Sequence, residues 1–242
     1  MTSGPVLSLR AVDAGYGPFR ALFGVNLDVG PGEALAVLGP NGAGKTTVAR
    51  VASGLIAPSA GQVLVAGDDL TGRRTFRYTR AGVAHAPEGR SVFATLTVSE
   101  NLSVSFERSL GRREVRTALD RAFQLFPRLG ERHGQLAGTL SGGEQRMLSM
   151  ARVLVEKPKL LIADELSFGL APIVIDEVYR ALASIRETGT AMLIVEQHVS
   201  NALELCDRVV LMDRGRLVWE GGPAEAAATV ADRLFDHAQD AP

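Results

Sequence analysis

A chain of 242 residues with 46% apolar residues is long enough to bury the core of one large domain, or of a core with a small appendage. Its 26 basic and 27 acidic residues give a formal charge of −1, so no overall cationic field favours a nucleic acid or an anionic lipid surface. The single Cys206 excludes an internal disulfide, and the N-terminus has no basic head followed by a long apolar stretch. The longest apolar runs are far shorter than the roughly 20 residues that cross a bilayer. These features favour a cytosolic protein.

Apolar periodicity predicts the following elements in chain order. The alternating segments Val6–Val12 and Ala21–Val29 predict antiparallel strands that flank a core. Short continuous apolar runs predict buried parallel strands: Ala34–Leu38, Leu160–Ala163, Ala191–Val195 and Arg208–Met212. Helical spacing predicts helices: Lys45–Ser53, Val98–Phe106, Arg112–Phe126, Met147–Val155, Ile173–Arg186 and Val199–Cys206. Because strands and helices alternate as βα units, the chain is predicted to be an α/β protein with an α-rich insertion.

A glycine-rich loop joins the strand Ala34–Leu38 to the helix that begins at Lys45. The loop and the start of the helix match the phosphate-binding pattern G-x-x-x-x-G-K-[ST] with the residues Gly39, Pro40, Asn41, Gly42, Ala43, Gly44, Lys45 and Thr46. Thr47 comes directly after this pattern and is assigned to the same nucleotide site. Glycines let successive backbone N–H groups surround a phosphate, and the helix N-terminus adds its positive end to the same anion. We expect Lys45 to reach the β- and γ-phosphates of ATP and Thr46 to offer its hydroxyl to Mg²⁺.

Two adjacent carboxylates, Asp164 and Glu165, follow the apolar strand Leu160–Ala163. The carboxyl end of such a strand opens into the crevice where α/β sheets bind ligands. We therefore expect Asp164 to hold the Mg²⁺ shell and Glu165 to polarise the attacking water as a general base. The alternative is a pair of solvated carboxylates at a helix entrance.

The segment Leu140–Gln145, with the sequence LSGGEQ, precedes the predicted helix Met147–Val155. Ser141 and Glu144 have the spacing of a capping box, which satisfies free N–H groups at a helix start. A capping box does not explain the consecutive glycines at 142 and 143, which open backbone donors to a second anion.

In this order, the phosphate loop, the strand-end carboxylates and the LSGGE segment resemble the motifs of ABC-transporter ATPases over nearly the whole chain. The resemblance implies a P-loop NTPase (RecA-like) core with an antiparallel β subdomain and an α-helical signature subdomain. We expect residues 1–87 and 157–242 to form the core with the β subdomain, and residues 88–156 to form the helical subdomain. The resemblance also implies an ATPase in which two subunits pair head to tail. The residues of one subunit that would then close over the ATP of the other are Ser141, Gly142, Gly143 and Glu144.

The resemblance assigns further positions in the site. Tyr16 lies where the family has an aromatic residue that stacks on adenine, and the alternative is an aromatic cap on the first strand. Glu88 replaces a glutamine that touches the metal and the attacking water, so its carboxylate would bind the cation more strongly. Gln197 aligns with a histidine that contacts the γ-phosphate, and a rival alignment gives this role to His198. Leu166 replaces the proline usual after the general base, which predicts a looser turn.

Three short segments narrow the subfamily: Pro87–Arg90, Leu170–Pro172 and Val195–Gln197 occur together in the ATP-binding subunits of branched-chain amino-acid importers of the LivF type. This resemblance implies a second ATPase subunit, identical or different, transmembrane permease subunits and, indirectly, a periplasmic or extracellular binding protein. The chain would lie in the cytoplasm, peripheral on the inner face of the cell membrane. Residues 88–111 would meet a permease helix through an apolar groove formed in part by Val92, Phe93, Leu96 and Val98. The alternative is that these four residues pack internally.

Other functions remain open from the sequence. An importer of urea or short amides has the same motifs, and so has a soluble ABC ATPase that acts on a macromolecule. The near-zero net charge argues against a nucleic-acid partner. A P-loop kinase is disfavoured because it would not account for the consecutive glycines at 142 and 143 before a helix. The cluster Arg73, Arg74, Arg77 and Arg80 is interpreted as a solvated face. His85 and His133 have no second ligand at zinc spacing, and we assign no metal to either.

Overall fold

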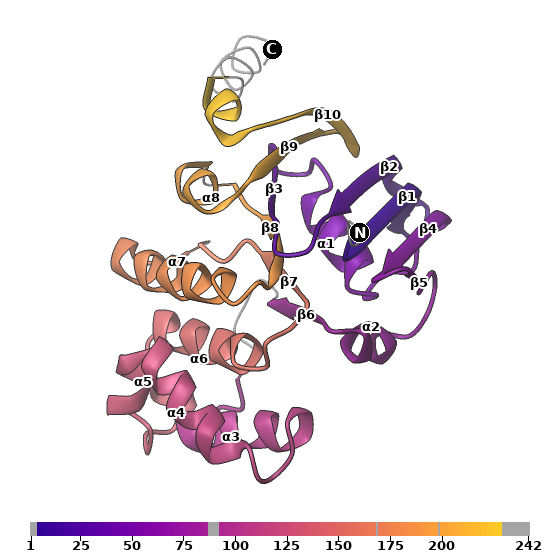
Figure 1. Ribbon diagram of the computed structural model, residues 1–242. Helices are drawn as coiled ribbons and strands as arrows, with labels where there is room; N and C mark the ends of the chain where they lie inside the picture. Colours follow the sequence, from indigo (N-terminus) through magenta and orange to yellow (C-terminus); the bar gives the residue numbers. More distant parts are fainter. Residues whose placement is uncertain (1–3, 87–91, 168, 198, 229–242) are drawn as a thin grey trace.

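The computed structural model describes residues 4–86, 92–167, 169–197 and 199–228. Figure 1 shows a four-stranded sheet and a six-stranded sheet with helices packed around them. The first sheet is antiparallel, in the order β2-β1-β4-β5: β1 (Leu7–Tyr16), β2 (Phe19–Val29), β4 (Ala60–Val65) and β5 (Asp68–Asp69). The second has the order β10-β9-β3-β8-β7-β6: β3 (Ala34–Leu38), β6 (Val83–Ala86), β7 (Leu160–Asp164), β8 (Ala191–Val195), β9 (Arg208–Asp213) and β10 (Arg216–Gly221).

The six-stranded sheet is parallel except for its edge strand β10, which is antiparallel to β9. The labelled α-helices are α1 (Lys45–Ala52), α2 (Thr75–Ala81), α3 (Val98–Ser109), α4 (Val115–Leu125), α5 (Pro127–Glu131), α6 (Gly142–Leu154), α7 (Pro172–Arg186) and α8 (Val199–Leu205), and residues 223–228 are also helical. None of the described helices is long and apolar enough to span a bilayer.

Both faces of the parallel sheet are buried at its centre, which explains why β3 and β8 are apolar throughout. In β3, Ala34, Ala36 and Leu38 belong to the core shared with the helices α3–α8. Leu35 and Val37 belong to a second core, shared with α1 and the four-stranded sheet. Successive side chains of a strand point to opposite faces, so each strand contributes to both cores. Figure 1 shows the result, with α7 and α8 on one side of the sheet and α1 on the other.

The helices α3–α6 pack on one another and form the magenta and pink part of Figure 1. Their buried residues include Phe106 and Leu148, which belong to the same core as Ile194 of β8. The division of the chain into a core and a helical subdomain stays a prediction, because one hydrophobic core runs through both parts.

The strands and helices predicted from apolar periodicity are all present, with ends that differ by a few residues. The prediction missed β4, β5, β6, β10, α2, α5 and the 3₁₀ helix Ala137–Thr139, most of which are short. In β6, His85 interrupts the apolar run, and the pattern therefore contains no continuous apolar segment. Strand β10 alternates between exposed and half-buried residues, as expected at the edge of a sheet.

Gly54, directly after α1, provides a test of the packing between α1 and α2. Its φ is +70°, and a Cβ atom there would lie 2.3 Å from the ring of Tyr78, whose hydroxyl donates to the Leu70 carbonyl at 2.8 Å. We expect Gly54→Ala to lower the free energy of unfolding by about 2–5 kcal/mol, from left-handed backbone strain and overpacking together. Urea unfolding followed by circular dichroism measures this loss.

Gly72→Ala is the matched control, because Gly72 has a φ of +63° and a Cβ atom there would have no neighbouring atom within 4 Å. It should lose only the backbone contribution, about 1–2 kcal/mol. Equal losses in the two variants would contradict the close contact between residue 54 and the Tyr78 ring.

Candidate functional site

The loop between β3 and α1 lies at the carboxyl end of β3. Gly44 precedes α1 with a φ of +102°, and a Cβ atom there would lie 2.9 Å from the Ala21 carbonyl oxygen, so glycine suits the position. Lys45 begins α1 and its Nζ donates to the carbonyls of Gly39 at 2.9 Å and Pro40 at 3.1 Å. The first N–H groups of a helix have no partner within the helix. The loop therefore offers backbone donors and an ammonium group to one anion.

Lys45 is almost completely buried, with 3% of its surface exposed. Burial lowers the pKa of its ammonium group, and the carboxylates of Glu165, Asp164 and Glu196 offset part of this shift. The Nζ atom lies 3.8 Å from Glu165 Oε1. A cation in such a partly desolvated place interacts more strongly with a phosphate than it would in water.

The end of β7 lies beside the phosphate loop because β8 pairs with both β3 and β7 in one parallel arrangement. Asp164, the last residue of β7, is 2% exposed. The Thr46 hydroxyl donates to its Oδ1 at 3.2 Å, across 118 positions of sequence. A hydroxyl and a carboxylate next to a phosphate loop form the oxygen-rich donor set that Mg²⁺ prefers, so these residues fit the predicted metal.

Glu165 follows in a left-handed backbone conformation, with a φ of 47°, and its N–H donates to the Val195 carbonyl at 2.8 Å. The next residue, Leu166, is 2% exposed. Ser167 donates from its N–H and its hydroxyl to the two carboxylate oxygens of Glu196, at 3.0 and 2.8 Å. The turn after Glu165 is therefore anchored at Glu165 and Ser167, and the looser turn expected from Leu166 stays a prediction.

Arg146 is a residue of the site that the sequence analysis missed. It is 5% exposed, and its guanidinium donates to the backbone carbonyls of Asp164 at 3.4 Å and Glu165 at 3.3 Å. Arginine is rarely buried without such partners. No sequence signal pointed to it, because the predicted helix begins one residue later, at Met147, and in the structure α6 begins at Gly142. Arg146 connects α6 to the strand end that carries both carboxylates.

Ser141 caps α6 and forms the predicted capping box with Glu144. The Ser141 hydroxyl accepts from the Glu144 N–H at 3.3 Å, and Glu144 Oε2 accepts from the Ser141 N–H at 2.8 Å. Burial raises the pKa of Glu144, but these hydrogen bonds and the ion pair with Arg132, at 2.9 Å, lower it overall. The Glu144 carboxylate is thus engaged within its own chain.

No hydrogen bond or ion pair joins residues 141–144 to residues 39–47 within the part of the chain that the structure describes. The nucleotide contacts predicted for Ser141, Gly142, Gly143 and Glu144 stay a prediction.

Tyr16 lies at the end of β1 beside α1. Its ring is 44% exposed, its hydroxyl accepts from Arg50 Nη1 at 3.1 Å, and the Arg50 guanidinium lies 5.9 Å from the ring centroid. Arg50 belongs to α1, whose first residues are Lys45 and Thr46. An exposed aromatic ring beside the phosphate-binding helix is suited to stacking on a base.

The remaining predicted residues divide into two groups. Gln197 is exposed after the end of β8 and its N–H donates to Glu196 Oε2 at 3.2 Å. His198, the alternative γ-phosphate contact, and Glu88, the predicted metal ligand, lie outside the described residues.

In the predicted apolar groove, Phe93 is 48% exposed, but Val98 is fully buried in the core. The groove prediction is therefore wrong for Val98, which packs internally as the first residue of α3.

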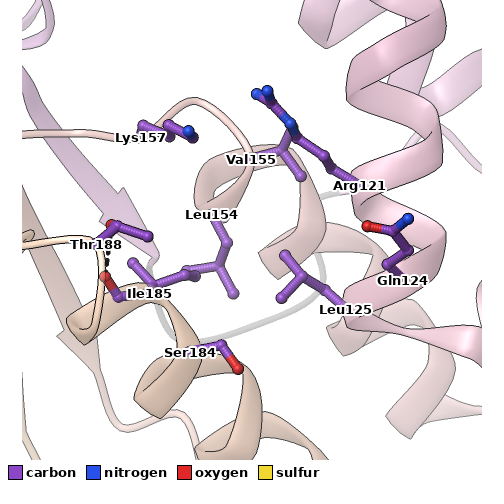
Figure 2. Close-up of a pocket in the computed structure, with 9 residues that line it drawn as sticks. All are labelled: Arg121, Gln124, Leu125, Leu154, Val155, Lys157, Ser184, Ile185 and Thr188. Atoms are coloured by element: carbon purple, nitrogen blue, oxygen red, sulfur yellow. Dashed lines mark hydrogen bonds between the residues drawn. The ribbon is translucent and has the colours of Figure 1, made fainter.

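A cavity of about 330 Å³ lies away from the phosphate loop, between α4, the end of α6 and α7. Figure 2 shows the residues that line it. Its floor contains Leu125, Leu154 and Ile185, and Arg121 and Lys157 lie at its rim. None of its lining residues belongs to the phosphate loop, the end of β7 or residues 141–144. This cavity is not part of the candidate nucleotide site.

Residues 22–167 match the ABC transporter family model. The chain belongs to this family. The matched segment contains the phosphate loop, residues 141–144 and the carboxylates at the end of β7. The chain is accordingly an ATP-binding domain with ATPase activity.

Relatives and solved structures agree with the family over nearly the whole chain. BraG of Pseudomonas aeruginosa, a high-affinity branched-chain amino acid transport ATP-binding protein, is 40% identical over 88% of this chain and 91% of its own length. The Archaeoglobus fulgidus protein named "probable branched-chain amino acid transport ATP-binding protein LivF" is 36% identical over 95% of this chain and 94% of its own length. LptB of Escherichia coli, a lipopolysaccharide export system ATP-binding protein, is 31% identical over 90% of this chain and 91% of its own length.

The structure of an ATP-binding subunit of an ABC transporter superposes with a TM-score of 0.83 at 25% identity, over 96% of this chain and 98% of its own. CbiO1 of Clostridium perfringens, part of the ABC transporter complex CbiONQ, superposes with a TM-score of 0.80 at 26% identity, over 93% of this chain and 91% of its own. The predicted α/β fold of the P-loop type is confirmed.

Substitutions of Tyr16 test its role in this ABC ATPase. We expect Tyr16→Ala to weaken ATP binding about tenfold, because loss of base–aromatic stacking costs about 1–3 kcal/mol. Tyr16→Phe keeps the ring, loses the bond to Arg50 and should bind ATP as the wild type does. Titration with a fluorescent ATP analogue measures both. Equal losses in the two variants would favour the alternative of an aromatic cap held by its hydroxyl.

Proposed function

We propose that this ABC ATPase powers the uptake of branched-chain amino acids through a membrane permease. The proposal rests on the similarity to BraG, which extends over 88% of the chain at 40% identity and exceeds that to LptB, at 31%. In this proposal the chain lies on the cytoplasmic face of the membrane and pairs with a second ATPase subunit. A binding protein on the other side of the membrane would deliver the substrate.

We propose that ATP binds as its Mg²⁺ complex. Thr46 and Asp164 would hold Mg²⁺, which neutralises charge on the β- and γ-phosphate oxygens when bound. Lys45 and the backbone donors of the phosphate loop bind and orient the phosphates. In this proposal Glu165 accepts a proton from the attacking water, because its carboxylate lies 3.8 Å from Lys45 Nζ and therefore close to the place of the γ-phosphate. The backbone at Glu165 is held by its N–H, which donates to the Val195 carbonyl.

Phe93 supports the proposed contact with the permease. It is 48% exposed, and the guanidinium of Arg152 lies 5.4 Å from its ring centroid. Asn101, which is fully buried, holds the backbone at Phe93 by accepting from its N–H at 2.8 Å and donating to its carbonyl at 3.0 Å. The ring therefore stands on a fixed segment, which suits it to contact an apolar side chain of a partner.

Transport in proteoliposomes tests the proposed substrate. The complete complex with its permease and binding protein should accumulate labelled leucine, isoleucine or valine when ATP is supplied. Glu165→Gln should retain ATP but reduce hydrolysis and uptake by about 10²–10⁴-fold, because general-base catalysis contributes about this much. Uptake of urea but not of these amino acids would contradict the substrate, and wild-type hydrolysis by Glu165→Gln would contradict the general base.

Disulfide trapping tests the head-to-tail pairing. Asn41 and Ser141 are both exposed, so a double variant Asn41→Cys/Ser141→Cys in the Glu165→Gln background should form a crosslinked dimer only when ATP and Mg²⁺ are present. The native Cys206 can remain, because burial raises the pKa of its thiol to about 11 and keeps it protonated. Each single-cysteine variant is a control. If ATP produces no dimer even with the permease present, the shared site is wrong.

A further inference from the structure

His85 is a partly buried histidine beside the proposed metal ligand Asp164. It lies in β6 opposite Ile162 of β7, and 10% of its side chain is exposed. Its Nδ1 lies 3.2 Å from the hydroxyl of Ser53, the residue that ends α1. Its Nε2 lies 3.9 Å from Asp164 Oδ2 and has no hydrogen-bond partner among the described residues. The imidazole thus extends from the end of α1 to the carboxylate at the end of β7.

The contact between His85 and Ser53 is compatible with both tautomers of the neutral imidazole. If His85 Nδ1–H donates to the Ser53 oxygen, the Nε2 lone pair faces Asp164 Oδ2, 3.9 Å away. If the Ser53 hydroxyl, which also lies within reach of the Ala49 and Arg50 carbonyls, shares its proton with Nδ1, Nε2–H faces Asp164 Oδ2 instead. The second arrangement places a donor opposite a carboxylate and the first places two acceptors opposite each other, so we assign the proton to Nε2.

A separation of 3.9 Å is too long for a hydrogen bond, so the contact is an electrostatic attraction between Nε2–H and the carboxylate. The Nε2 atom is buried and has no other partner among the described residues, so solvent screens this attraction little. The imidazole thus connects Asp164 to Ser53, and through Ser53 to α1. The other carboxylate oxygen, Oδ1, already accepts from Thr46 of the same helix.

We propose that His85 is a positioning residue for Asp164: anchored on α1 by Ser53, its imidazole attracts Oδ2 through Nε2–H while Thr46 holds Oδ1. The inference rests on the proposed function, because it concerns how Asp164 is presented to Mg²⁺. Residues that orient a ligating carboxylate typically change metal affinity 10–100-fold when they are replaced.

Two substitutions separate this role from packing. His85→Asn keeps an amide within reach of Ser53 but has no atom at the place of Nε2. His85→Gln is longer, and its terminal amide can reach that place. His133→Asn is the matched control, because His133 is an exposed histidine whose Nδ1 contacts the Gly130 carbonyl.

The experiment measures Mn²⁺ binding, by electron paramagnetic resonance, to the purified chain with a non-hydrolysable ATP analogue. Nucleotide affinity in EDTA is measured in parallel. We expect His85→Asn to bind Mn²⁺ at least about tenfold more weakly with its metal-free nucleotide affinity unchanged. His85→Gln should recover most of the loss, and His133→Asn should equal the wild type.

Wild-type Mn²⁺ affinity in His85→Asn would overturn the inference and leave the proposed function intact. An equal loss of nucleotide affinity with and without metal would also overturn it, because that result indicates a packing role. If the wild type binds the analogue neither with nor without Mn²⁺, the proposed function itself fails.

Discussion

The contact between Thr46 and Asp164 is the constraint on which the rest of the site depends. It joins a helix start and a strand end that are 118 residues apart in sequence. Both arrive at one place because β3 and β7 flank β8 in a parallel sheet, so that their carboxyl ends share an edge. The burial of both faces of that sheet, by α1 on one side and α7 on the other, keeps this edge fixed.

Much of this arrangement could be predicted because each signal lies in contiguous residues. The buried strand Ala34–Leu38, the glycine loop and the helix at Lys45 follow one another directly, and so do Leu160–Ala163 and its two carboxylates. Strands such as β10 and the two-residue β5 could not be predicted, because their residues are largely exposed and carry little apolar periodicity. Their pairing partners, not their own residues, determine that they are strands.

The side chains that hold the site in place were much harder to predict than those that would touch ATP. Arg146, Glu196 and His85 each connect segments that are far apart in sequence, and no local pattern announces such a contact. Glu196 precedes the predicted phosphate contact Gln197, yet its buried carboxylate holds the turn at Ser167. A motif identifies residues that meet the ligand, whereas the supporting contacts depend on which elements the fold brings together.

The cap of α6 has a consequence for how two chains would meet. Ser141 uses its hydroxyl oxygen to accept from the Glu144 N–H, and this leaves the hydroxyl proton available as a donor. A phosphate oxygen of an incoming nucleotide would accept a hydrogen bond from this hydroxyl without any unwinding of the helix. The hydrogen bonds that cap the start of α6 thus also fix the Ser141 side chain for recognition. The conformational entropy of that side chain is therefore lost when the monomer folds and not when the subunits assemble.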